Sequence, residues 1–271
     1  MSTRDITSGP VRVETGTDPE LAVVTVHHPP LNLYDRDLHT ALLEAVTALE
    51  QQRPRGALFR AEGKVVSGGV DVRDAFLPLA QNRDVEAGRR YFAELVELGE
   101  RVHLLPFPTV FAAHGLTLTW AFELALACDL IVAGESASFG LIEATVGLTP
   151  AMGGTQRLAE RVGQGRAKYF AMTAGRFGAV EMERWGVVDR MVPDDEVDGA
   201  SRELARSLAA GPTRAHAATK EILRELAVGG LGQANARTAE IAGALFGTED
   251  LRGAMESFVE RGHGKATFTG R

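Results

Sequence analysis

Disulfide bonds within the chain are excluded, because its 271 residues include a single cysteine, Cys128. A chain without disulfides fits a reducing compartment, so we expect a cytoplasmic protein. The neighbours of Cys128 are apolar, which predicts a small core residue rather than a nucleophile. Residues 1–10 are polar and predict no signal peptide. No run reaches the ~18 apolar residues that cross a bilayer, so we expect no membrane span.

Positive charge is also scarce, since 29 Lys and Arg face 36 Asp and Glu and the net charge is −7. This balance argues against a nucleic-acid partner and against binding to an anionic membrane surface. Hydrophobic residues make up 45% of the chain, which is enough for a substantial core. The composition therefore favours an ordinary globular protein of one large or two small domains.

Several motifs of catalysis and cofactor binding are missing. The chain contains no G-x-G-x-x-G, no P-loop, no G-x-S-x-G and no paired C-x-x-C, and its histidines show no H-x-x-x-H or H-E-x-x-H spacing. These absences disfavour a dinucleotide enzyme, an NTPase, a serine hydrolase and a zinc enzyme, so we expect no metal and no separate cofactor. His114 precedes a glycine at a predicted strand end without a partner in sequence, which favours a structural role.

Apolar periodicity predicts strands mixed with helices in the first two-thirds of the chain and helices alone from Asp194 onward. The predicted strands are 11–15, 21–26, 56–60, 109–113, 130–133 and 187–192. Asp35 is placed to cap the first helix, and a second helix is predicted over 85–105. The segment 76–84 has no clear period and carries Pro78, so we expect a loop there.

Two glutamates stand out because each interrupts an apolar stretch. Glu123 lies in the middle of 112–129, and Glu143 follows twenty residues later within 139–144. Charged side chains are rarely buried unless they are paired or used. Two buried glutamates on neighbouring elements indicate general acid–base chemistry with shifted pKa values. The alternative is that each carboxylate is merely paired or caps a helix within the core.

Glycine-containing loops offer backbone donors for such chemistry. One is Ser67-Gly68-Gly69-Val70-Asp71, and the other is the turn before Glu123. Glycine lets the backbone approach a ligand closely, and N–H groups from two loops can stabilise a developing oxyanion. For Asp71 we favour a helix-capping role over direct chemistry.

Taken in order, these segments resemble the crotonase (enoyl-CoA hydratase/isomerase) superfamily over nearly the whole chain. The matching segments are 30–33, 66–72, 114–115, 123–125 with 128–129, 139–140 with Glu143, 147–158 and 265–271. The resemblance implies an α/β (α+β) fold. It further implies a spiral of ββα units over 1–200 and a helical trimerisation region over 201–271. The protein would then form a homotrimer or a hexamer built as a dimer of trimers.

The resemblance also implies an acyl-CoA thioester substrate, so that coenzyme A belongs to the substrate. The backbone N–H groups of Val70 and Trp120 would hold the thioester oxygen. Glu123 would activate water, and Glu143 would exchange the proton at C2. Residues implied in binding coenzyme A or substrate are Ala61, Lys64, Ser67, Gly69, Asp71 and Val72, with Lys265 and Phe268 reaching the site of a neighbouring subunit.

The chain departs from the family where glycines usually precede the first glutamate, because here the residues are Thr119-Trp120-Ala121. Trp120 stands at the second oxyanion donor. If its φ is helical the donor survives, whereas a positive φ would disrupt the oxyanion hole. We expect the indole to fill part of the acyl pocket or to pack against a modified helix start. Simple core packing is the alternative.

Both glutamates are retained, which favours an enoyl-CoA hydratase that adds water to a 2-enoyl-CoA. The first alternative is an isomerase, a decarboxylase or another enzyme of thioester-enolate chemistry. The second is a non-catalytic binding subunit with the same fold, since fold does not fix function. The sequence leaves the acyl group, the chain length and the pathway open.

Overall fold

A twisted sheet of seven strands forms the centre of the computed structural model, which describes residues 5–16 and 20–271. Its spatial order is β1-β2-β3-β4-β5-β7-β10, in which β2 is antiparallel to both of its neighbours, β1 and β3, and the remaining neighbours pair in parallel. The strands are β1 Ile6–Ser8, β2 Val11–Thr15, β3 Leu21–Val26, β4 Gly56–Ala61, β5 Thr109–Ala113, β7 Leu130–Gly134 and β10 Arg190–Val192. Five of the six predicted strands start and end within one residue of these bounds, while the sixth, 187–192, is ordered as a strand only over its last three residues.

A second, three-stranded sheet lies beside the carboxyl ends of the large one. It consists of β6 Leu116–Leu118, β8 Ser138–Gly140 and β9 Arg176–Gly178. These strands are too short for a period-two pattern to be read from sequence, and they were not predicted. The small sheet matters because β6 leads directly into the helix that carries Glu123, while Glu143 follows β8 by three residues.

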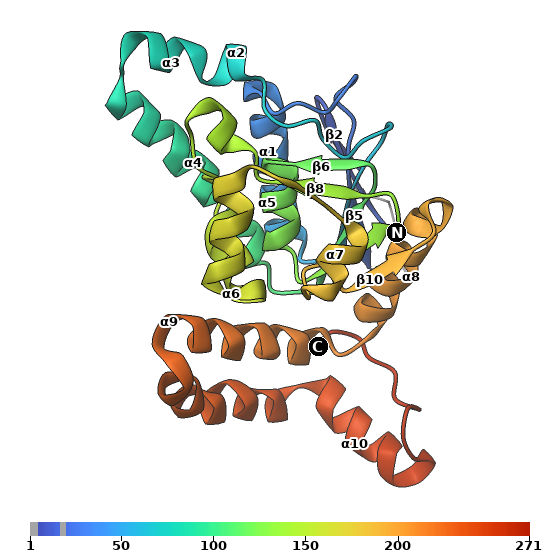
Figure 1. The fold of residues 1–271 in the computed structure, drawn as a ribbon. Coiled ribbons are helices and arrows are strands. Elements are labelled where there is room, and N and C mark those ends of the chain that lie inside the picture. The colour runs from blue at the N-terminus through green and yellow to red at the C-terminus, as the bar shows by residue number, and fades with distance from the viewer. Residues whose placement is uncertain (1–4, 17–19) are drawn as a thin grey trace.

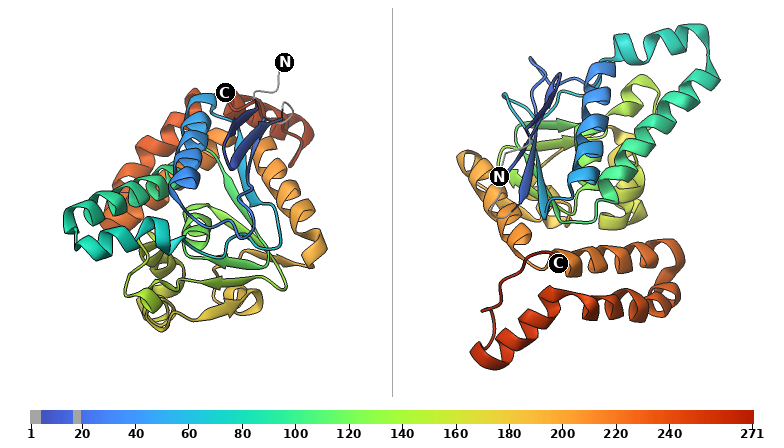
Figure 2. Two further views of the ribbon diagram at one scale, coloured as in Figure 1. Left: turned by 90° about the horizontal axis from the view of Figure 1, so that it is seen from above. Right: turned by 180° about the vertical axis from the view of Figure 1, so that it is seen from behind.

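Helices cover both faces of the large sheet (Figure 2). Helices α1 Arg36–Gln52, α4 Val85–His103 and α5 Trp120–Ala127 pack on one face in the main hydrophobic core. Helix α8 Val197–Ala210 covers the other face with a smaller apolar cluster. All eight residues of α5 are buried, as expected for a helix that is apolar on every side. Figure 1 shows α5 at the centre of the core.

The segment 76–84 corrects one prediction. It was expected to be a loop, but Leu77–Asn82 form helix α3, which follows the single turn of α2 Val72–Ala75. Pro78 lies in the first turn of α3, where its missing N–H leaves no helical hydrogen bond unmade. The helix has no buried residues, so the apolar period that identifies longer helices was absent from the sequence.

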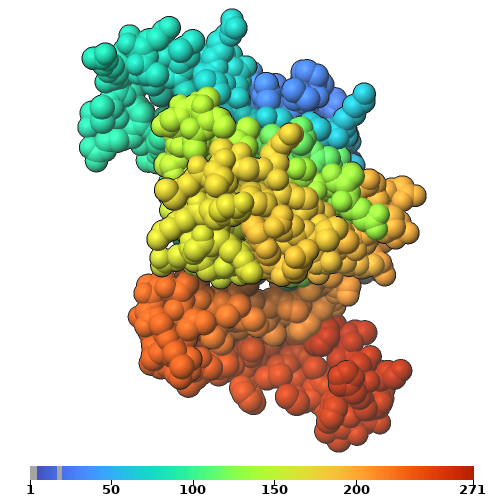
Figure 3. Space-filling model, in the orientation of Figure 1, coloured from blue at the N-terminus to red at the C-terminus, as the bar shows by residue number. Residues whose placement is uncertain are grey.

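Helices α6 Gly154–Thr173, interrupted at Gly163, and α7 Ala179–Arg184 flank β9 in the sheet domain. Helices α9 Thr213–Gly243, interrupted at Gly230, and α10 Glu249–Arg261 form the carboxyl-terminal arm. Gly230 has a φ of 71°, and there α9 folds back on itself. Helices α9 and α10 form a lobe of their own below the sheet domain (Figure 3).

The arm exposes several large apolar side chains on α9, the following turn and α10. These are Leu223, Leu226, Val228, Leu231, Phe246, Met255, Phe258 and Val259.

The predicted boundary between residues 200 and 201 falls inside α8, whose side chains pack on β4 and β5. The division at 200 and the trimerisation role of the arm stay predictions. Within the residues that the structure describes, no helix is both long and apolar enough to cross a membrane.

Candidate active site

Glu123 is held in the core by a row of backbone donors. It lies in the first turn of α5 and is 4% exposed. Its carboxylate accepts N–H hydrogen bonds from Met152 (2.7 Å), Gly154 (2.7 Å) and, more weakly, Ala151 (3.3 Å). Gly154 begins α6, so the positive end of that helix faces the carboxylate. A Cβ at Gly154 would lie 2.5 Å from Glu123 Cγ, so only glycine leaves room for this approach.

The pKa of Glu123 is raised to about 7, because burial penalises the charged form more than the three N–H groups and Arg157 favour it. Arg157 also holds the donor loop in place. Its guanidinium donates to the Met152 carbonyl (2.8 Å) and to Glu100 on α4 (3.2 Å). The carboxylate of Glu123 is therefore both rigidly placed and able to take up or release a proton near neutral pH.

Glu143 approaches the same space from a different kind of element. It begins a short 3-10 turn, Glu143–Val146, and its neighbours 144–147 are exposed. Its Oε2 atom is buried and has no hydrogen-bond partner among the described residues. Burial, together with the negative charge of Glu123, raises the pKa of Glu143 to about 8. A carboxyl group in this setting is protonated at neutral pH and can donate that proton.

The two glutamates line one cavity of about 30 Å³. Val70 and Trp120 line it as well, so the cavity joins the predicted acid–base pair to both predicted oxyanion donors. The rest of the wall is Tyr34, Phe76, Phe92, Leu95, Leu148, Thr149, Ala151 and Met152. Apolar walls around a few polar groups are typical of small-molecule sites.

The backbone donors of Val70 and Trp120 are free. Neither N–H group has an acceptor within residues 5–16 and 20–271. Trp120 is the first residue of α5 and does not have a positive φ, so the helical alternative holds and its N–H is intact. The strain lies one residue earlier, at Thr119, with φ 50° and ψ −118°. A β-branched residue rarely adopts this conformation, which favours glycine.

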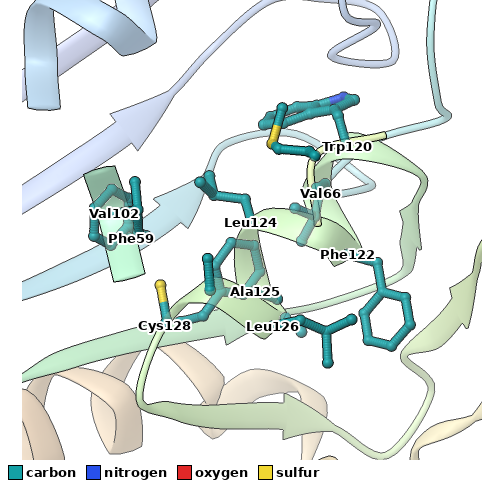
Figure 4. Close-up of a cluster of buried hydrophobic side chains, with 14 of the residues drawn as sticks. Phe59, Val66, Val102, Trp120, Phe122, Leu124, Ala125, Leu126 and Cys128 are labelled. Carbon is teal, nitrogen blue, oxygen red and sulfur yellow. The ribbon is translucent and has the colours of Figure 1, made fainter. Parts of the chain in front are cut away.

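The Trp120 side chain ties together three segments that are distant in sequence. Its Nε1–H donates to Ser67 Oγ (2.7 Å) and to the Asn32 carbonyl (3.3 Å), and its ring lies 5.5 Å from that of Tyr34. In Figure 4 the indole lies beside Val66 at one end of α5, with Cys128 at the other. Trp120 is thus a lining residue of the cavity, and its indole packs at the helix start.

Ser67 and Gly69 build the loop that presents Val70. Ser67 is fully buried, and its hydroxyl accepts from Gly69 N–H (2.9 Å) and donates to the Asn32 carbonyl (2.8 Å). Gly69 has a φ of 119°, which glycine adopts without strain. Asp71 caps α2 by accepting from the Arg73 and Asp74 N–H groups, as predicted, and Val72 is 41% exposed at the start of that helix. Their predicted contacts with substrate stay predictions.

The other residues predicted to bind coenzyme A lie apart from the glutamates. Ala61 and Lys64 line a separate pocket of about 420 Å³ with His114 and the turn before α8. Lys265 and Phe268 belong to the tail, which Asp250 holds through the Thr269 and Gly270 N–H groups. Gly270 lies next to Arg55, which precedes β4, whereas Ala61 ends that strand. Within one chain the tail and the loop after β4 are therefore at opposite ends of the sheet.

Two structural expectations are confirmed. Cys128 is buried in the main core, and burial raises the pKa of its thiol to about 12. Asp35 caps α1 by accepting from the Leu38 N–H. His114 bonds the Gly63 carbonyl at 3.1 Å, a contact that fits its predicted structural role.

Sequence reasoning missed the residues that shape the cavity and fix its loops. Tyr34, Phe76 and Phe92 supply rings to the wall, and Arg157 holds the loop that donates to Glu123. Each belongs to an ordinary-looking segment, and only the tertiary fold brings it to the site. The G-G-T-Q-R-L segment was noted as matching, but nothing in it indicated that its arginine contacts the loop beneath Glu123.

Comparisons with known proteins agree with this architecture. The family model "Enoyl-CoA hydratase/isomerase" matches residues 16–271. A short-chain-enoyl-CoA hydratase from Clostridium acetobutylicum is 30% identical over 245 residues, covering 89% of this chain and 92% of its own. A carnitinyl-CoA dehydratase from Salmonella enteritidis is 36% identical over 203 residues, covering 74% of this chain and 76% of its own.

A solved structure of an enoyl-CoA hydratase from Bacillus anthracis superposes with a TM-score of 0.85 at 26% identity, covering 97% of this chain and 100% of its own. The match extends through the carboxyl-terminal helices as well as the sheet domain. The fold, the family model and the relatives agree with the resemblance inferred from the sequence, and the chain belongs to the enoyl-CoA hydratase/isomerase (crotonase) superfamily.

Proposed function

We propose that the protein is an enoyl-CoA hydratase that adds water across the double bond of a 2-enoyl-CoA thioester. One observation carries the proposal: a single cavity is lined by two glutamates with raised pKa values and by two residues whose backbone N–H groups have no acceptor in the described chain. Hydration of a conjugated thioester requires one base, one acid and an oxyanion site. The cavity offers all three.

The oxyanion site acts first. The thioester oxygen accepts hydrogen bonds from the Val70 and Trp120 N–H groups, which makes C3 electrophilic and stabilises the enolate that forms on addition. Both donors are fixed by neighbours, since Trp120 and the loop before Val70 share the Ser67 hydroxyl. Donors that need no rearrangement stabilise developing charge best.

The two glutamates then divide the proton transfers. Glu123, in its ionised form, takes a proton from water while the water oxygen bonds to C3 and the double-bond electrons move to the enolate. Glu143, in its neutral form, gives its proton to C2 as the thioester carbonyl re-forms. The product is a 3-hydroxyacyl-CoA, and the pair ends with its single proton on Glu123, from which it returns to Glu143. The assignment follows from three N–H donors on Glu123 and, among the residues that the structure describes, none on Glu143 Oε2.

The remaining expectations belong to this proposal. Coenzyme A lies against Ala61, Lys64 and the loop at 67–72, and Lys265 and Phe268 complete the site of a neighbouring subunit in a trimer or hexamer. The exposed apolar side chains of α9 and α10 support such an assembly. The single cysteine supports a cytoplasmic location.

Incubation with crotonyl-CoA and with a longer or aromatic enoyl-CoA in deuterated water tests the reaction. Mass spectrometry should detect the addition of water together with deuterium at C2. Deuterium uptake or double-bond movement without added water would instead indicate an isomerase or other enolate chemistry. Tight thioester binding by calorimetry with no turnover would indicate a binding subunit.

A further inference from the structure

We infer that the paired rings of Trp120 and Tyr34 limit the acyl group to short chains, so that Trp120 is a specificity-determining residue. This inference rests on the proposed function, because it assumes that the acyl group reacts between Glu123 and Glu143. It adds the class of substrate, namely enoyl-CoA thioesters with only a few carbons beyond the double bond.

The size of the cavity is the first observation. Its volume is about 30 Å³, room for two or three water molecules, where a water needs roughly 10–15 Å³. Both glutamates and both oxyanion donors already border this space. The carbons beyond C3 of a substrate must therefore lie against the remaining wall, to which Tyr34, Phe76 and Phe92 contribute rings.

The second observation is that one side of this wall is fixed. Trp120 and Tyr34 are 3% and 1% exposed, and their rings are 5.5 Å apart. The indole Nε1–H is held by Ser67 Oγ, and the Tyr34 hydroxyl lies 2.7 Å from His39 Nδ1. Rotating either ring would leave a buried polar group without its partner, which is unfavourable. We therefore expect these two rings to keep their positions when a longer acyl group is offered.

Two other rings of the cavity wall, Phe76 and Phe92, are packed differently. Phe76 and Phe92 are only partly buried and contact each other edge to face at 6.0 Å, with Tyr91 beside them. They come from the α2–α3 junction and from α4, and their rings carry no polar atom that fixes a rotamer. A short acyl group can be accommodated by small shifts of these two rings, whereas the fixed pair Trp120 and Tyr34 sets the limit.

The test compares hydration of trans-2-enoyl-CoA substrates of four, six, eight and ten carbons by the intact protein. For the wild type, kcat/KM should fall by at least about tenfold from four to eight carbons, within the range for added methylenes in a closed pocket. Trp120→Ala should raise the eight-to-four-carbon ratio of kcat/KM by at least about tenfold, whatever its effect on the absolute rate.

Three further variants complete the test, two as controls and one as a second way to open the cavity. Trp120→Phe keeps a ring but removes the indole N–H, and it should keep most of the chain-length preference. Trp185, the second tryptophan, packs against Phe177 outside the cavity, so Trp185→Ala should leave the ratio unchanged. Tyr34→Ala opens the same side of the cavity and should change the ratio in the same direction as Trp120→Ala, which keeps the test decisive if one variant does not fold.

The outcomes separate this inference from the proposed function. Equal rates for four and ten carbons in the wild type, or an unchanged ratio in both Trp120→Ala and Tyr34→Ala, would overturn the inference while leaving a hydratase. No hydration of any thioester, with crotonyl-CoA included, would overturn the proposed function and with it the inference.

Discussion

Two regions present a glutamate to the same cavity, and they differ in almost every other respect. Glu123 belongs to a fully buried helix and is bonded by backbone N–H groups at the start of α6. Glu143 belongs to a short turn whose following residues are exposed, and its inner oxygen has no partner in the described chain. Donors around a carboxyl favour its ionised form, and burial without donors favours its neutral form. One cavity can thus hold a base and an acid of the same residue type.

The largest expected effect separates the two glutamates by proton transfer at C2. Glu143→Gln removes the acid and should lower hydration by about 10³-fold, within the usual range for a general acid or base, while C2 exchange in deuterated water disappears. Glu123→Gln should lower hydration comparably but retain more C2 exchange, because Glu143 is intact. Mass spectrometry of the 3-hydroxyacyl-CoA measures the exchange. Small and equal losses in both variants would contradict the division of roles.

A smaller effect should follow from displacing Glu123 without changing it. Gly154→Ala places a Cβ 2.5 Å from Glu123 Cγ, so the carboxylate must move. Misplacement by about 1 Å can lower kcat about 10²-fold. Gly165→Ala is the matched control, because it lies in the same helix and its Cβ would meet nothing within 4 Å. If both variants have wild-type kcat, the position of Glu123 is not critical.

The pH dependence of kcat/KM in the wild-type protein tests the same comparison without a substitution. Below about pH 7 Glu123 takes up a proton and cannot accept one from water, and above about pH 8 Glu143 loses the proton that it must donate. The value of kcat/KM should therefore peak between these limits and fall about tenfold per pH unit on either side. In Glu143→Gln the residual rate should lose its alkaline limb. A profile that is flat from pH 5 to 9 would contradict both assignments.

The smallest expected effect concerns stability. The pKa of Glu143 is raised from 4.5 to about 8 in the folded protein. The neutral folded form is favoured, so stability is full below about pH 4.5 and is lost as pH rises toward 8. Glu143→Gln should reduce that loss by an amount on the order of 1 kcal/mol. Urea unfolding midpoints at pH 4.5 and pH 8 measure it, and an identical pH dependence in both proteins would refute it.

Much of this arrangement follows from patterns within the sequence. The parallel strands are continuous apolar runs, and the glutamates interrupt such runs, so both could be identified by contrast with their neighbours. The cap at Asp71 follows from its place before a short helix. These features depend on residues only a few positions apart, which is the range over which a single sequence is informative.

Features that depend on distant contacts could not be predicted. Trp120 contacts Asn32, 88 residues away, and Ser67, 53 residues away, so the direction of its indole was open between pocket and core. The cavity wall likewise brings together rings from distant segments. Tyr34 comes from the segment before α1, Phe76 from the junction of α2 and α3, and Phe92 from α4. The short helix α3 was missed because it buries nothing, and the conformation of Thr119 was missed because threonine rarely adopts it.

Thr119 shows that the fold, rather than the residue, sets the backbone at this turn. A threonine with φ 50° and ψ −118° is held about 1–3 kcal/mol above its relaxed conformation. Glycine adopts such a backbone without that strain, so Thr119→Gly should relieve it, although glycine loses more conformational freedom on folding. The direction of the Trp120 N–H is thus imposed by the packing around the turn and not by the preference of the residue before it.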